Sequence, residues 1–176
     1  MIQHFTKTDY TVMPWANGKG ETTEIYRRDQ DGHLHWRISM AAVVKDGPFS
    51  HFQDTLRSLT VISGKGFDLV EETRRFRADP LKPVSFSGEV PITAENVLGK
   101  CNDFNVMWNF GLPRPDVYVL ENQRQIIQPH EGQVAIFAVK SSQIKGYKLK
   151  RHDMILTNEP VEFIKGTIIC VGMEFY

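Results

Sequence analysis

Two arginines are the strongest candidates for binding an anion. Arg37 lies in a segment that alternates polar and apolar residues, and Arg57 follows the aromatic and hydroxyl residues between Pro48 and Thr55. An arginine guanidinium presents a fixed planar fork of donors that matches a carboxylate. Such a charge-assisted bond contributes ~1.5–3 kcal/mol when it is sheltered from water. A competing interpretation, at least as well supported by the sequence, pairs these arginines with protein carboxylates such as Glu24 or Asp54.

Other side chains would orient or enclose the same ligand. Asn105 can both donate and accept a hydrogen bond, and Met107 shares its strand face and could form an apolar wall. The alternative is a strand start, in which Asp103 and Asn105 satisfy backbone groups at a turn. The predicted ligand-binding residues are Trp15, Asn17, Arg37, Ser39, Phe49, Ser50, Phe52, Arg57, Asn105 and Met107.

A glycine-rich segment runs from Trp15 to Glu24 and could present backbone N–H groups to an anion. It is not a phosphate loop, because no strand-like run precedes it and the residues from Thr22 to Arg28 indicate a strand, not a helix. A hairpin or bulge built on Asn17-Gly18 is favoured by about two to one.

Histidines offer an enzymatic alternative. His33 and His35 point the same way on a strand, but a metal site needs a further ligand, and Arg37 on the same face would oppose a cation. We therefore expect no metal or other cofactor. The alternatives left open are a metal-dependent enzyme that uses His33 and His35, and a metal-free isomerase with His51 as proton shuttle. No nucleophile elbow is present.

Strand-like alternation must position these residues. Between His33 and Ala42 the apolar side chains fall on one side and Arg37 and Ser39 on the other. Asn-Gly, Asp-Gly and Ser-Gly turns separate many short runs, which favours an all-β sandwich or barrel. The further strand-like runs are Leu56 to Ile62, Phe67 to Glu71, Val84 to Ser87, Asn105 to Phe110, Val117 to Leu120, Gln125 to Gln128, Val134 to Val139, Met154 to Thr157, Val161 to Ile164 and Thr167 to Val171.

No amphipathic helix is expected, and residues 54–59 could form one helical turn at most. A faint internal similarity between the segments that begin at Leu59 and Val134 indicates two related β-rolls, with the best break in the pattern at residues 111–115. We expect the two rolls to pack as a single unit.

The composition excludes several partners. The 176 residues contain 21 basic and 21 acidic side chains, so no surplus of positive charge favours nucleic acid. No apolar run approaches the length that crosses a membrane. The N-terminal residues do not resemble a signal peptide, and Cys101 and Cys170 are expected to be reduced thiols in the cytoplasm.

An ordered set of motifs resembles the HutD/Ves family. It comprises Trp15-x-Asn17-Gly18-x-Gly20-x-Thr22, Trp36-Arg37-x-Ser39-x-Ala41, Pro48-Phe49-Ser50-x-Phe52-x-x-x-x-Arg57-x-Leu59, Gly64-x-Gly66, Phe86-x-Gly88 and Asp103-Phe104-Asn105-x-Met107. The chain departs from the family pattern at Trp108 and Asn109, where arginine is usual after Met107, and at residues 53–55, which replace a Pro-Gly turn.

The resemblance implies a bicupin of residues 1–176, with cupin-type β-rolls of the RmlC-like jelly-roll kind over residues 1–112 and 113–176. It also implies a non-enzymatic protein that binds a small polar or anionic metabolite, such as urocanate or formylglutamate. That protein would modulate histidine utilisation or, as in a second branch of the family, a stress response. A homodimer is left open.

Overall fold

Strands account for nearly all of the regular structure. The computed structural model describes residues 1–15, 20–129 and 132–174, and within them the only helical element is a 3-10 turn, η1 (Lys7–Asp9). This confirms the all-β prediction. The chain separates into two compact units, Thr11–Leu112 and Met1–Tyr10 with Pro113–Tyr176.

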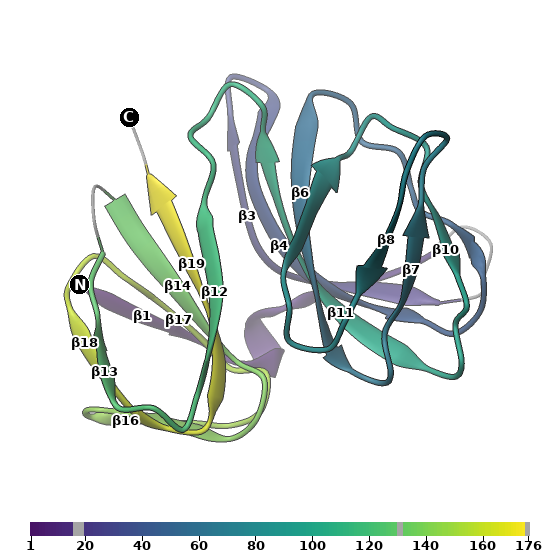
Figure 1. Ribbon diagram of the computed structural model, residues 1–176. Coiled ribbons are helices and arrows are strands. Elements are labelled where there is room, and N and C mark those ends of the chain that lie inside the picture. The colour runs from purple at the N-terminus through teal and green to yellow at the C-terminus, as the bar shows by residue number, and fades with distance from the viewer. Residues whose placement is uncertain (16–19, 130–131, 175–176) are drawn as a thin grey trace. The chain divides into compact units, whose positions relative to one another are not determined.

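The first unit is a β-roll made of two sheets (Figure 1). Its strands pair antiparallel throughout both sheets. The larger sheet contains, in order across it, β2 (Thr11–Pro14), β3 (Glu21–Gln30), β4 (His33–Val43), β11 (Cys101–Asn109), β6 (Thr55–Ser63) and β9 (Val84–Ser87). The smaller sheet contains β5 (Gly47–Pro48), β10 (Thr93–Glu95), β7 (Phe67–Val70) and β8 (Arg75–Ala78).

The predicted alternation along β4 is what gives the larger sheet two different faces. Met107 of β11 lies opposite both Arg37 of β4 and Arg57 of β6, and residues paired in this way project from the same face. Leu59 and Val61 lie on that face too and pack into a core with side chains of the smaller sheet. A polar strip on β4, β11 and β6 is therefore continuous with the apolar interior of the roll.

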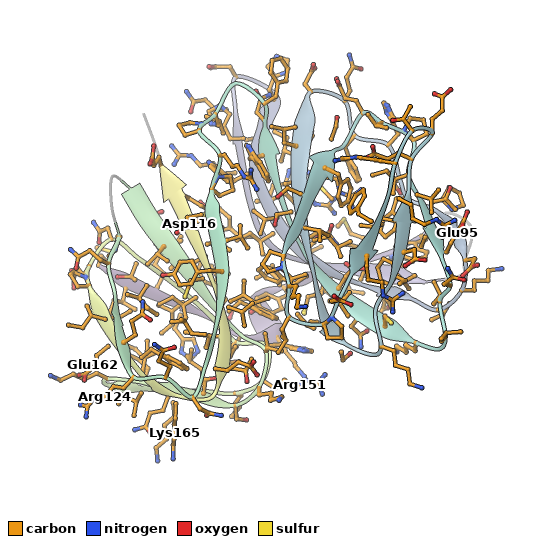
Figure 2. All side chains as sticks on the ribbon, viewed as in Figure 1. Glu95, Asp116, Arg124, Arg151, Glu162 and Lys165 are labelled. Carbon is orange, nitrogen blue, oxygen red and sulfur yellow. The ribbon has the colours of Figure 1, made fainter. Side chains whose placement is uncertain are left out.

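The second unit has the same two-sheet construction. One sheet contains β1 (Ile2–Phe5), β17 (Met154–Thr157), β14 (Gly132–Ala138), β19 (Thr167–Glu174) and β12 (Asp116–Glu121). The other contains β13 (Gln125–Ile127), β18 (Val161–Lys165), β15 (Ser142–Ile144) and β16 (Tyr147–Leu149). Its core consists of aliphatic residues together with Phe163 and Cys170. At its surface Arg124 and Glu162 form an ion pair of 2.6 Å (Figure 2).

The first ten residues belong to this second unit, because β1 pairs antiparallel with β17 from Phe5 opposite Met154 to Ile2 opposite Thr157. The sequence predicts halves of 1–112 and 113–176. The structure has the same break after Leu112, but β1 belongs to the unit that contains residues 113–176. The packing of both rolls as one unit stays a prediction.

Residues 55–59 begin β6, so the segment that could have formed a helical turn is extended. None of the helices among the described residues is long and apolar enough to span a membrane.

Candidate functional site

Arg37 and Arg57 are both buried and both approach one aromatic ring. Their residues are 9% and 4% exposed, respectively. The guanidinium carbon of Arg37 lies 5.8 Å from the centroid of the Phe52 ring, and that of Arg57 lies 5.4 Å from the same centroid. Met107, 3% exposed, lies between the two arginines in the sheet register. The structure therefore brings together four of the predicted ligand-binding residues.

The Arg57 guanidinium occupies an aromatic cage. Its central carbon lies 5.3 Å from the Phe49 ring centroid and 5.0 Å from that of Phe86. Stacking a desolvated cation on such rings contributes about 2 kcal/mol or more. Arg57 Nη2 donates to Asn105 Oδ1 at 2.9 Å and Nη1 donates to the Ser50 carbonyl at 3.4 Å. Its Nε is buried and has no partner among the described residues.

Burial lowers the pKa of Arg57 to about 10, with the Asp103 carboxylate opposing and the Arg37 charge reinforcing that shift. Arg57 is therefore still a cation at neutral pH. A buried cation with one unused N–H is a group that requires an acceptor.

Asp103 completes a hydrogen-bonded chain behind Arg57. It is fully buried, and Asn105 Nδ2 donates to its Oδ1, while Oδ2 has no partner within the described residues. Burial raises the pKa of Asp103 to about 7, although the Arg57 charge and the Asn105 hydrogen bond oppose the shift. The sequence alone predicted a turn role for Asp103. The Asp-x-Asn spacing places Asp103 and Asn105 on the same strand face, and this spacing is the signal that could have identified Asp103 as a site residue.

Arg37 does pair with a protein carboxylate, as the competing interpretation expected. Its Nε donates to Glu24 Oε2 at 2.7 Å, and the Glu24 side chain is 16% exposed. No residue in the described ranges accepts a hydrogen bond from either Nη of Arg37. Asp54 is the other expected partner, but it forms backbone contacts instead, among them a hydrogen bond from its backbone N to Glu89 Oε1. The side chain that accepts a hydrogen bond from Arg57 is Asn105.

The loop that carries Phe49, Ser50 and Phe52 is held against Gly88. Phe52 N donates to Gly88 O at 2.8 Å, and Gly88 N donates to Thr55 O at 2.7 Å. A Cβ at residue 88 would lie 2.8 Å from Phe52 O and 2.9 Å from Thr55 O, so only glycine fits without displacing the loop. The Ser50 residue is exposed and contacts Arg57 through its carbonyl, not its hydroxyl.

Trp15 has a local structural role at the β2–β3 hairpin. Its Nε1 donates to Thr22 Oγ1 at 2.9 Å, and its ring lies over Gly20, where a Cβ would come within 2.8 Å of it. β2 and β3 pair antiparallel on either side of this segment, and the predicted turn at Asn17-Gly18 lies outside the described residues. Asn17 lies outside the described residues. Ser39, 2% exposed, faces Asn105 across β4 and β11.

The sequence matches the family model described as HutD over residues 7–167. The chain belongs to the HutD family. A curated relative from Pseudomonas putida, described as an uncharacterized 21.2 kDa protein in the hutC 3′ region, is 36% identical over 112 residues. That alignment covers 61% of this chain and 58% of the relative, so the chain spans somewhat more than half the relative's length.

Solved structures agree with the HutD assignment. HutD from Pseudomonas fluorescens SBW25, determined in a formate condition, has a TM-score of 0.86 at 27% identity over 99% of this chain and 98% of that one. A conserved protein of unknown function from Pseudomonas aeruginosa PAO1 has a TM-score of 0.87 at 23% identity, with coverages of 99% and 100%. The pirin YhhW from Escherichia coli, solved with nickel(II), has a TM-score of 0.66 at 9% identity and shows the fold alone, over 99% of this chain and all of that one. The two units are thus cupin-type β-rolls.

The histidines do not assemble into a site in the described part of this HutD-family chain. His33 and His51 are exposed, and His35 is half-buried. No group of three or more histidine, cysteine, aspartate or glutamate side chains that could hold a metal is found among the described residues.

Proposed function

We propose that this chain is a non-enzymatic binding protein for a small carboxylate metabolite, held in the first β-roll between Arg37 and Arg57. The observation that carries this proposal is the convergence of two buried guanidinium groups on Phe52. Among the described residues, Arg57 Nε has no acceptor, and Arg37 donates to Glu24 through its Nε alone. A carboxylate supplies two acceptor oxygens with the geometry that a guanidinium fork prefers. The aromatic rings and Met107 form the apolar walls typical of a small-ligand site.

Local charge favours one carboxylate group at Arg57. Arg37 is already balanced by Glu24, whereas Arg57 contacts a neutral amide and a carbonyl and approaches Asp103 only through Asn105. The positive charge available to a ligand is therefore concentrated at Arg57. A carboxylate that accepts from Arg57 Nε and from an Nη of Arg37 would satisfy the donors that the protein leaves open.

We further propose that the ligand belongs to histidine utilisation, with urocanate and formylglutamate as the first compounds to test. Membership of the HutD family and the relative from the hutC 3′ region support this assignment. The alternative role in stress response predicts that neither compound binds.

A thermal-shift titration tests the proposal. A carboxylate present at a hundred times its Kd should stabilise the protein by about 2.7 kcal/mol, because it binds only the folded state. Arg57→Ala should abolish the shift, whereas Arg124→Ala, which removes an arginine with a 71% exposed side chain in the second unit, should leave it unchanged. If no carboxylate metabolite raises the melting temperature of the wild-type protein, the proposal is wrong.

Because Arg57 is buried, a second variant guards against misfolding. Arg37→Gln retains a polar side chain next to Glu24 but loses the guanidinium, so it should weaken ligand binding at least tenfold while the protein stays folded by circular dichroism.

Elemental analysis of the purified protein tests the non-enzymatic part. Stoichiometric iron, zinc or manganese that is lost on His35→Ala would favour the metal-dependent alternative instead.

A further inference from the structure

The charged groups around Arg57 form a small set. In the described part of the first roll they are Glu24 on β3, Arg37 on β4, Arg57 on β6 and Asp103 on β11. Glu24 also lies 3.9 Å from the partly exposed Arg27, whose charge is balanced by Asp29. The charged residues of the nearby loop, His51, Asp54 and Glu89, are exposed. With Asp103 ionised this set is neutral, and with Asp103 protonated it carries one positive charge.

Few groups near Asp103 can stabilise its negative charge. Ala41 of β4 and Val61 of β6 lie opposite it in the sheet register, and Phe67, Leu69 and Ala94 of the facing sheet belong to the adjoining apolar core. The titratable group next to it on its own strand face is Cys101, whose Sγ contacts the carbonyls of Gly66 and Gly99.

The hydrogen-bond chain links Asp103 to the ligand donor. Asp103 Oδ1 accepts from Asn105, and Asn105 in turn accepts from Arg57 Nη2 at 2.9 Å. Asp103 Oδ2 is buried without a partner in the described ranges. An ionised Asp103 therefore depends on the Arg57 charge, and a ligand carboxylate at Arg57 would compete for that same charge.

We propose, building on the carboxylate-binding function above, that Asp103 is the proton-linked residue of the site: one carboxylate group of the ligand binds at Arg57 with the uptake of one proton by Asp103. The balance is an ionised Asp103, one solvent proton and one ligand anion giving a neutral Asp103 beside the bound anion. No bond other than O–H forms.

The direction of the pH effect follows from linkage. The bound anion disfavours ionised Asp103, so protonation of Asp103 must strengthen anion binding by the same factor. Below pH 7 Asp103 is already neutral and affinity is at its plateau, because its pKa is raised to about 7. Above pH 7 the affinity should fall by up to tenfold per pH unit.

Isothermal titration calorimetry with formylglutamate tests this proposal, because its carboxylates remain ionised from pH 5.5 to pH 8.5. At pH 8, titrations in two buffers of different ionisation enthalpy should give an uptake near one proton per ligand, and at pH 5.5 an uptake near zero. Asp103→Asn, which keeps a polar side chain next to Asn105, should bind with a pH-independent Kd and no uptake. Asp116→Asn, an exposed control on β12 of the second unit, should retain the uptake.

Two outcomes separate this inference from the function on which it rests. If formylglutamate binds with no proton uptake and a constant Kd, or if the uptake persists in Asp103→Asn, the proton linkage is wrong and carboxylate binding stands. If no carboxylate binds at any pH, the proposed function has failed first. Should Asp103→Asn not fold, the infrared band of a protonated carboxyl decides: it must appear when ligand is added to wild-type protein at pH 8, and its absence overturns the inference.

Discussion

At the residue scale, the candidate site is a set of buried polar groups whose partners were only partly predictable. The pairing of Arg37 with Glu24 was foreseen as one of two interpretations, because both residues fall on polar positions of neighbouring strands. The hydrogen bond from Arg57 to Asn105, in place of a pairing with Asp54, could not be predicted, because it depends on the register of β6 against β11. Asp103 was missed because its burial is a tertiary property.

Asp103 makes folding stability depend on pH. Burial raises its pKa to about 7 in the folded protein from the ordinary value of 3.8, so between those pH values the folded state holds a proton that the unfolded state has released. The free energy of unfolding therefore falls as pH rises from about 4 to 7, by up to about 1.4 kcal/mol per pH unit. Urea unfolding of wild-type protein and Asp103→Asn across this range should show a decline that is shallower in the variant. Parallel curves would contradict the assignment.

At the scale of elements, alternation made the long central strands predictable, while only some of the short edge strands were predicted. β4 and β6 alternate over many residues, and the predicted Val84–Ser87 run matches the short edge strand β9. In contrast, β1, β2 and β8 are four-residue strands at sheet edges. Such short edge strands bury few side chains, so their pattern is weak. Arg75 and Arg77 of β8 both pair with Asp68 of β7.

Gly88 positions the loop above the arginines, and its replacement should affect stability and binding together. Gly88→Ala would place a Cβ within 2.9 Å of two backbone carbonyls, and moving that backbone should cost about 1–3 kcal/mol. Gly47→Ala is the matched control, because nothing lies within 4 Å of the added Cβ. Melting temperatures and ligand titrations should separate the two variants. Equal behaviour would show that Phe52 is not held through Gly88.

At the scale of the molecule, each cupin roll is built around its own core, and the N-terminal strand completes the roll that is distant in sequence. β1 forms an edge of the second unit, where Ile2 packs against the core. A family resemblance and repeated strand patterns predicted two rolls. They could not predict this crossover, because β1 carries no signal for its partner β17.

This partition predicts a localised response to a change in β1. Ile2→Asp should destabilise the second unit by about 1–3 kcal/mol, because it places a charge against an apolar core. Hydrogen exchange should then quicken in β17 and β14 and stay unchanged in β6 and β11. Faster exchange throughout both units would contradict a division into separate cores.

The central claim is that Arg37 and Arg57 jointly hold a carboxylate, and a crystal structure with saturating formylglutamate tests it most directly. The account predicts carboxylate density within hydrogen-bonding distance of Arg57 Nε and an Nη of Arg37, beside the Phe52 ring. The account would be contradicted by a ligand that binds elsewhere while Arg57 stays hydrogen-bonded only to Asn105 and the Ser50 carbonyl.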